Sequence, residues 1–124
     1  MSRVQLSINV GDFDAAMSFY TLLFGAPAKI RPGYANFAVD DPPLKLVLNS
    51  PGNGPGGTIN HLGVEVASTE EVTQAGARLA AEGLAIEPEP GATCCYARQD
   101  KVWAHDPEGV AWEYYTVLEH IETP

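Results

Sequence analysis

Two adjacent cysteines, Cys94 and Cys95, carry the most unusual chemistry in this sequence. Neighbouring cysteines close no useful loop, which excludes a structural disulfide framework, so we expect two thiols. Thiol sulfur is a soft ligand that suits thiophilic centres such as As(III), Cd(II) or Hg(II). Both thiols can bind one atom only where the backbone is irregular, which a glycine-containing loop over 90–96 permits. Alternatively, one cysteine packs as a small hydrophobic residue and its neighbour has no role.

A second set of residues, Gln5, His61 and Glu113, combines an amide, an imidazole and a carboxylate. This mixed donor set suits Fe(II), Mn(II), Ni(II) or Zn(II) and leaves about three coordination positions open on an octahedral metal, which favours redox or Lewis-acid chemistry. Alternatively, His61 is a hydrogen-bonded structural residue and Glu113 is solvated. His105 and His120 are other candidates, but the former precedes a turn and the latter lies in a polar tail.

Strand alternation explains how the three residues could share a site. Apolar residues occupy the even positions of 4–10 and of 62–66, so Gln5 and His61 lie on the opposite, polar face of their strands. In the last strand, Glu113 shares a face with Tyr115. A curved sheet with two-fold symmetry would bring both first strands near the last ones, so we expect Gln5, His61 and Glu113 to converge.

Two helices are predicted between the strands. Asp12 caps a helix over 13–24 that ends at Gly25, and Ser68 with Glu71 forms a capping box for a helix over 69–82 that ends at Gly83. The first helix is expected to bury the face made by Ala16, Phe19, Tyr20 and Leu23, and the second the face made by Val72, Ala75 and Leu79. Short strands fill the remainder, at about 27–31, 34–40, 44–49, 85–89, 96–105 and 110–117.

The element order is therefore βαβββ twice, in modules of about 1–50 and 58–120 joined by a Gly/Pro linker over 51–57. The offset that maps Gln5 onto His61 also maps the apolar residues of the first strand onto those of its counterpart. One module alone has too small a core to be stable. We therefore predict one α+β domain over 1–124, with a curved mixed sheet around a cleft and the helices outside.

Composition narrows the possible partners. The chain has 124 residues and a formal net charge of −9, which argues against nucleic acid or an anionic membrane. We see no apolar run long enough to span a bilayer and no secretory signal, so a cytoplasmic protein is expected. The glycine-rich segment 52–57 lacks the Lys-Ser/Thr of a phosphate-binding loop.

The paired modules, with the turn 106–109 leading into Trp112-Glu113-Tyr114-Tyr115-Thr116, resemble the vicinal oxygen chelate superfamily of glyoxalases, bleomycin-binding proteins and extradiol dioxygenases. More narrowly, the chain is similar to the carbon–arsenic lyase and cadmium-induced protein family. The segments that carry this similarity are 32–37, 42–48, 57–66, 93–96 and 99–103. They extend over nearly the whole chain.

The narrower resemblance implies an O2-dependent, non-haem Fe(II) enzyme that cleaves the C–As bond of trivalent methyl or aryl arsenicals and releases arsenite. It implies that Gln5, His61 and Glu113 are the metal ligands, with no catalytic residue beyond them, and that Cys94 and Cys95 bind arsenic. Ni, Co, Mn or Zn could also occupy such a site. Tyr96 and Tyr115 could shape the pocket.

The resemblance also leaves alternatives. The superfamily usually has His where this chain has Gln5, but a glutamine at this position agrees with the lyase group. Strand 44–48 lacks the fourth metal ligand that is expected of a glyoxalase. A non-catalytic cadmium- or arsenic-binding resistance protein is the second expectation. A bleomycin-type binding protein would not need the metal ligands. The partners expected are small molecules, and the chain could be a monomer or a homodimer.

Overall fold

The protein is described by a computed structural model over residues 2–50 and 57–122, so most of the predicted linker lies outside the described residues. Its elements are β1 (Arg3–Asn9), α1 (Phe13–Phe24), β2 (Lys29–Arg31), β3 (Tyr34–Val39), β4 (Leu44–Asn49), β5 (Ile59–Glu65), α2 (Thr69–Ala81), β6 (Glu87–Cys94), β7 (Ala97–His105) and β8 (Ala111–His120). This confirms the α+β class and the repeated βαβββ order. Among the described residues, no helix has the length and apolar character to cross a membrane.

The chain divides into two compact units within β5. Residues Val4–Leu62 form the first unit, and the residues from Gly63 onward, with Arg3, form the second. The strand order is β2-β3-β4-β1-β5 in the first unit and β5-β8-β7-β6 in the second. β1 pairs with β4 in parallel, whereas β3 pairs antiparallel with β2 and β4, and β7 with β6 and β8. The mixed sheet that the sequence predicts is therefore confirmed.

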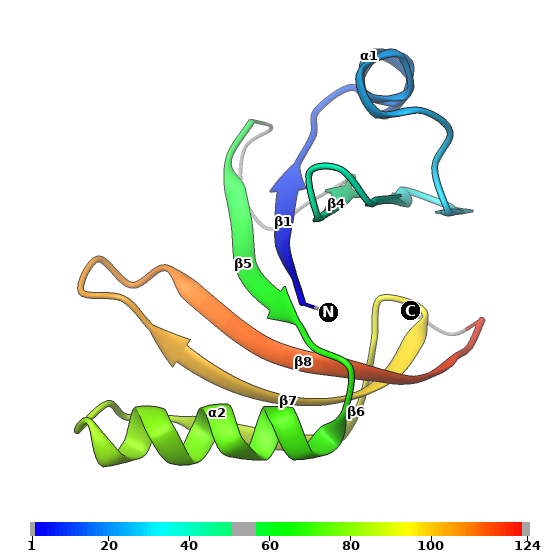
Figure 1. Cartoon of the computed structure of the whole chain (residues 1–124). Helices are drawn as coiled ribbons and strands as arrows, with labels where there is room; N and C mark the ends of the chain where they lie inside the picture. Colours follow the sequence, from blue (N-terminus) through cyan, green and yellow to red (C-terminus); the bar gives the residue numbers. More distant parts are fainter. Residues whose placement is uncertain (1, 51–56, 123–124) are drawn as a thin grey trace. The chain divides into compact units, whose positions relative to one another are not determined.

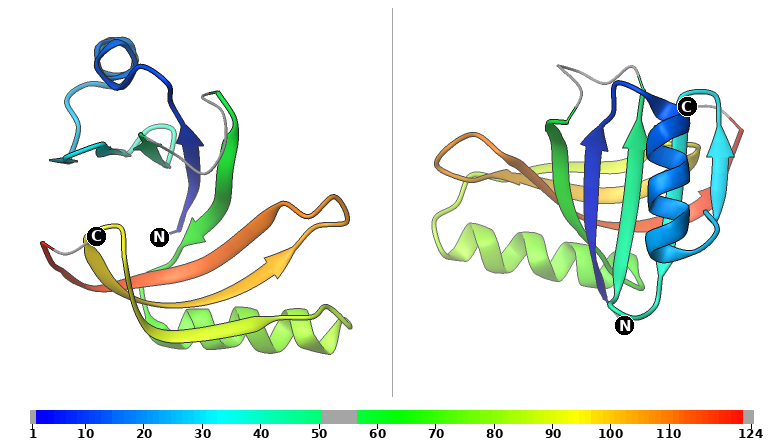
Figure 2. Two further views of the ribbon diagram at one scale, coloured as in Figure 1. Left: turned by 180° about the vertical axis from the view of Figure 1, so that it is seen from behind. Right: turned by 90° about the horizontal axis from the view of Figure 1, so that it is seen from above.

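Helix α1 covers one face of the first unit's sheet (Figure 2). Asp12 caps it by accepting from the Ala15 amide at 3.0 Å, and Gly25 ends it with a φ of 90°. The residues that pack onto the core of β3 and β4 are Phe13, Ala16, Met17, Tyr20 and Phe24. The predicted inward face was wrong at Phe19 and Leu23, which are 58% and 57% exposed.

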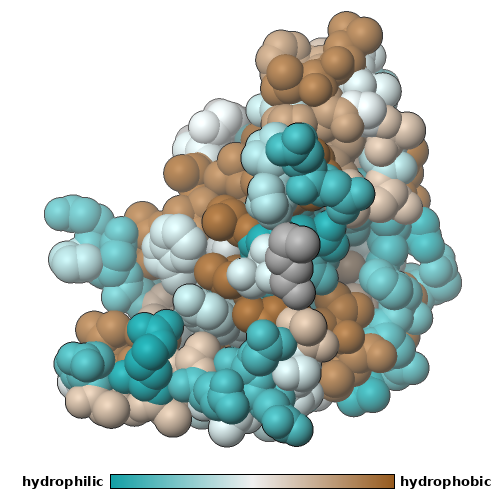
Figure 3. Space-filling view, viewed as in Figure 1, coloured by the Kyte–Doolittle hydropathy of each residue, from teal (hydrophilic) through white to brown (hydrophobic). Residues whose placement is uncertain are grey.

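The error in α1 has a physical cause. Residues 13, 17, 20 and 24 follow the helical period and form the apolar row that packs on the sheet. Further apolar residues extend beyond this row, and the helix buries only part of its apolar surface. Phe19, Leu22 and Leu23 form the outer side, which Figure 3 shows as apolar surface over α1 at the top of the view.

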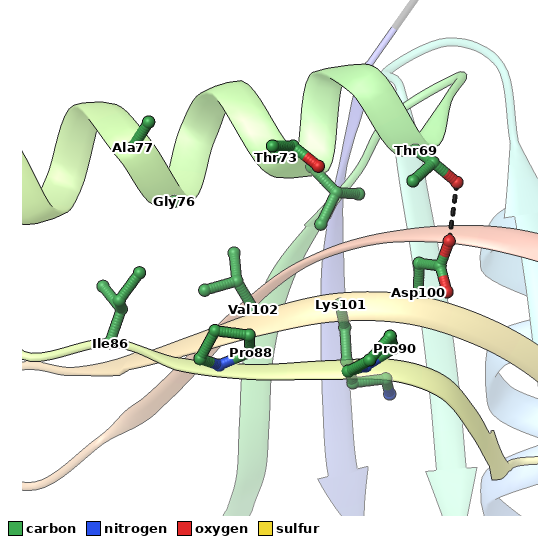
Figure 4. Close-up of a pocket in the computed structure, with 11 residues that line it drawn as sticks. Thr69, Thr73, Gly76, Ala77, Ile86, Pro88, Pro90, Asp100, Lys101 and Val102 are labelled. Atoms are coloured by element: carbon green, nitrogen blue, oxygen red, sulfur yellow. Dashed lines mark hydrogen bonds between the residues drawn. The ribbon is translucent and has the colours of Figure 1, made fainter.

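Helix α2 lies along one face of β7 and β8 (Figure 1). The predicted capping box is present: the Glu71 amide donates to Ser68 Oγ at 3.3 Å, and the Glu71 carboxylate accepts from the Ala67 amide at 3.0 Å. Val72 and Ala75 are buried, as predicted. Between α2 and the edge strand β6 lies a cavity of about 360 Å³ with a mainly apolar lining (Figure 4).

The second unit's sheet has two chemically different faces. Tyr114 packs with Val66, Val72 and Val102 on the α2 side, which confirms the predicted alternation in the last strand. Lys101 points away from α2, to the other side of the sheet (Figure 4). Glu113 and Tyr115, which alternate with Tyr114, are 2% and 0% exposed. The buried charged side chains of this sheet, Lys101 and Glu113, therefore lie on the face opposite α2.

Candidate functional site

In the first unit, β1 and β5 bring a set of uncharged polar side chains together. We call Gln5, Asn9, Thr58, Asn60 and His61 the amide cluster. His61 Nε2 lies 3.0 Å from Gln5 Nε2, and His61 Nδ1 lies 2.9 Å from Asn60 Oδ1. Gln5 is 5% exposed and Asn9 is 1% exposed. Two of the three predicted metal ligands, Gln5 and His61, are thus neighbours.

The cluster forms because β1 alternates strictly. Leu6 and Ile8 pack with α1 and the core, so Gln5, Ser7 and Asn9 face the other side, where all three are buried. Asn49 Nδ2 donates to Ser7 Oγ at 2.9 Å and to the Ile8 carbonyl at 3.2 Å, which satisfies polar groups that would otherwise be costly to bury.

In the second unit, the two cysteines lie at a tight turn between β6 and β7. Cys94 is the last residue of β6, pairs with Ala97 of β7, and is followed by Cys95 and Tyr96 with φ of 56° and 61°. A left-handed backbone at two successive residues matches a type I′ hairpin turn and is strained for non-glycine residues. The predicted 90–96 loop was thus wrong, because β6 extends to Cys94. The backbone is irregular at Gly91, where the β6–β7 register shifts, and the turn itself is at Cys95 and Tyr96.

Lys101 links the thiols to the third predicted ligand. Its Nζ lies 3.2 Å from Cys94 Sγ and 2.9 Å from Glu113 Oε1, in an ion pair whose side chains are only 2% and 3% exposed. The ammonium also lies 5.3 Å from the Trp103 ring centroid and 5.9 Å from that of Tyr115. We call Cys94, Cys95, Lys101, Trp103, Glu113 and Tyr115 the lysine cluster. A buried ammonium here balances the negative charge of the carboxylate and of a thiolate.

The electrostatics of the lysine cluster separate the two thiols. A hydrogen bond from Cys95 favours a Cys94 thiolate, Lys101 adds to this against the effect of burial, and the pKa of Cys94 falls from its ordinary 9.0 to about 6. The same hydrogen bond, together with burial, raises the pKa of Cys95. Burial opposes the charge on Lys101, but Glu113 and Cys94 outweigh it and raise the lysine pKa. The favoured state is a Cys94 thiolate beside a Cys95 thiol.

A glycine in β5 permits the close packing around Glu113. A Cβ added to Gly63 would lie 2.8 Å from Glu113 Cγ and 2.9 Å from the Glu113 carbonyl oxygen. The backbones of β5 and β8 therefore approach one another at a distance that only glycine allows. Glu89 supports the opposite edge of the cluster by accepting from Trp103 Nε1 at 2.9 Å.

Reasoning from the sequence missed Lys101 and Asn60. Alternation along β7 puts Lys101 on the face of Gln99 and Trp103, and its register places it opposite Tyr115, but no sequence signal distinguished a buried lysine from a solvated one. Asn60 occupies an even position, and strict alternation gives no indication that its side chain contacts His61. His105 and His120 are both exposed. Gln5 and His61 belong to the first unit and Glu113 to the second, so their convergence stays a prediction.

Comparisons with known proteins find relatives over nearly the whole chain. Residues 2–114 match the family profile described as the Glyoxalase/Bleomycin resistance protein/Dioxygenase superfamily. A Mycobacterium tuberculosis protein named "Cadmium-induced protein CadI" is 60% identical, over 99% of this chain and 81% of its own length. A Thermomonospora curvata protein named "Trivalent organoarsenical cleaving enzyme" is 50% identical, over 99% of this chain and 82% of its own.

Solved structures match the fold at lower identity. Homoprotocatechuate 2,3-dioxygenase from Arthrobacter globiformis is 22% identical, with a TM-score of 0.65 over 95% of this chain and 36% of its own. A superfamily member from Vibrio splendidus is 19% identical, with a TM-score of 0.57 over 95% of this chain and 100% of its own. These likenesses support the fold described above.

Proposed function

The chain belongs to the Glyoxalase/Bleomycin resistance protein/Dioxygenase superfamily, and on this premise we propose that it is an O2-dependent, non-haem Fe(II) enzyme that cleaves the carbon–arsenic bond of trivalent organoarsenicals. The observation that carries the proposal is the paired Cys94 and Cys95 beside the buried Lys101, since As(III) is thiophilic. Relatives at 50% and 40% identity, from Thermomonospora curvata and a Bacillus strain, bear the name "Trivalent organoarsenical cleaving enzyme".

In this proposal Gln5, His61 and Glu113 hold one divalent metal ion, and the two units act as one domain. The donor set fits: His61 Nδ1 is engaged by Asn60, which leaves Nε2 toward Gln5, whose amide oxygen can replace its nitrogen by rotation of the amide. Glu113 is a buried carboxylate whose charge Lys101 already balances. When bound, the metal supplies open coordination positions for O2 and a Lewis-acid centre.

The thiols bind the substrate. A trivalent arsenical with two hydroxyl groups exchanges both for sulfur: two As–S bonds form, two As–OH bonds break, and two waters leave with protons from Cys95 and solvent. The thiolate that the Cys95 hydrogen bond and Lys101 favour at Cys94 makes the first attack, because the thiolate is the nucleophilic form. Fixing arsenic between two sulfurs orients its carbon substituent and lowers the entropic part of the barrier.

The overall reaction balances without a further reductant. For a methyl substituent, CH3As(OH)2 and O2 give As(OH)3 and formaldehyde: the C–As bond breaks, carbon is oxidised and O2 is reduced. Aryl arsenicals are the other substrate class under this proposal.

The test uses protein loaded with Fe(II) under anaerobic conditions, to which a trivalent methylarsenical and then O2 are added. We expect arsenite to appear only after O2 is admitted, and the Cys94→Ser, Cys95→Ser double variant to release none. Equal turnover by the double variant would exclude the thiol role. Arsenite release without Fe(II) would exclude the metal role, and arsenite release without O2 would exclude the dependence on oxygen.

A second function is favoured by the 60% identity to proteins named for their induction by cadmium. In that case the Cys94–Cys95 pair sequesters Cd(II) or As(III) without turnover. Binding needs neither Fe(II) nor O2, so the same experiment separates the two functions.

A further inference from the structure

We propose that Asn60 is a positioning residue that fixes the tautomer of His61, so that the Nε2 lone pair is available to a metal ion. The inference deepens the proposed function, since it concerns the histidine assigned there as a ligand. It rests on a chain of hydrogen bonds within the amide cluster that runs from Thr58 through Asn9 and Asn60 to His61.

This series of hydrogen bonds begins at a backbone contact between β1 and the start of β5. The Asn9 amide donates to the Thr58 carbonyl at 2.8 Å, and the Gly57 amide donates to the Asn9 carbonyl at 2.7 Å. These two bonds hold β1 against the start of β5. Asn9 Nδ2 then donates to Thr58 Oγ1 at 2.8 Å, which leaves Asn9 Oδ1 directed toward Asn60. Because Asn9 is 1% exposed, water does not compete freely for its amide.

The next two bonds transmit this orientation to the imidazole. Asn60 Nδ2 donates to Asn9 Oδ1 at 3.0 Å, so Asn60 Oδ1 is the atom that faces His61 Nδ1, at 2.9 Å. An amide oxygen can only accept, so Nδ1 must carry the proton. A neutral imidazole has one N–H, which leaves Nε2 as the acceptor.

The other end of the ring is compatible with this tautomer. Gln5 Nε2 lies 3.0 Å from His61 Nε2, and in this orientation of the amide its nitrogen donates to an unprotonated Nε2. Asn60 therefore specifies the tautomer that a metal ion bound at Nε2 requires, and the Gln5 amide matches it. Groups that bind the second nitrogen of a ligating histidine typically change metal affinity by about 10- to 100-fold.

The decisive measurement is the tautomer of His61 in the metal-free protein, read from long-range ¹⁵N–¹H correlation at about pH 9, where imidazoles are neutral. The His105→Gln and His120→Gln variants assign the other two histidines. We expect protonated Nδ1 in the wild type and in Asn60→Asp, which keeps the acceptor. We expect loss of this preference in Asn60→Leu. A wild-type His61 protonated at Nε2 would overturn the inference.

Titration with Co(II) gives the second readout. Asn60→Leu should weaken Co(II) binding by about 10- to 100-fold, whereas Asn60→Asp should stay within a few-fold of wild type. Asn49→Leu is the matched control, because Asn49 is half-buried in the same unit but bonds Ser7 and Ile8. Equal affinity and tautomer in Asn60→Leu and wild type would also overturn the inference. If the wild type binds no Co(II), the proposed function fails, and the tautomer still decides the role of Asn60.

Discussion

The amide cluster and the lysine cluster lie in the two different compact units of the chain, and their polar groups are buried in opposite ways. The amide cluster is uncharged: each donor meets an acceptor at 2.8 to 3.0 Å, from Thr58 to His61. The lysine cluster is charged, with one ammonium between a carboxylate and a thiolate. Removing an amide leaves an unmet hydrogen bond, whereas removing the lysine leaves a buried charge, which costs more.

The largest expected effect follows from removing the ammonium. Lys101→Met leaves Glu113 buried without its counter-charge, so we expect the free energy of unfolding to fall by about 3–5 kcal/mol in urea denaturation. Arg98→Met is the control, because the Arg98–Glu119 ion pair has side chains 46% and 55% exposed. Exposed pairs contribute about 0–1 kcal/mol. Similar losses of unfolding free energy in both variants would show that the buried Lys101–Glu113 pair contributes no more to stability than an exposed ion pair.

The next effect concerns thiol reactivity and pH. Because the thiolate reacts, alkylation of Cys94 by iodoacetamide should rise as pH increases through about 6 and level off above pH 7, where an ordinary thiol with a pKa of 9.0 is still mostly protonated. Cys95, whose pKa is raised, should react much more slowly. In Lys101→Met the midpoint should move upward. Peptide mapping of the alkylated protein reports each cysteine separately, and equal rates for the two thiols would contradict the assignment.

Two glycines in the second unit allow a comparison of how tightly the two sides of its sheet are packed. A Cβ at Gly63 would strike the backbone oxygen of Glu113 at 2.9 Å, so Gly63→Ala should destabilise by about 1–3 kcal/mol. On the α2 side, a Cβ at Gly76 would meet Ile86 at 3.4 Å and Val102 at 3.5 Å, which is ordinary contact. Gly76→Ala should therefore stabilise the protein by about 0.5–1 kcal/mol through helix propensity.

Thermal unfolding of the two alanine variants checks this pair of expectations. The melting temperatures should move in opposite directions from wild type. If Gly63→Ala is as stable as wild type, the approach of β5 to β8 is less tight than described.

The sequence predicted most of the framework because its signals are local. Alternation in β1 identified the polar face of Gln5, Ser7 and Asn9, and the Ser68–Glu71 capping box marked the start of α2. It failed at Phe19, because the apolar residues of α1 extend beyond the row that packs and the sequence does not show which of them the sheet covers. It also missed Asn60 and Lys101, since their roles depend on partners far away in the chain: Asn9 for the first, Glu113 for the second.

Metal binding tests the central claim most directly. Under anaerobic conditions, titration with Fe(II) should show one ion bound per chain, and Gln5→Ala, His61→Ala and Glu113→Ala should each weaken that binding by at least about tenfold. His105→Ala should leave it unchanged, because His105 is exposed. Wild-type affinity in any one of the three variants, or no Fe(II) binding by the wild type, would contradict the account.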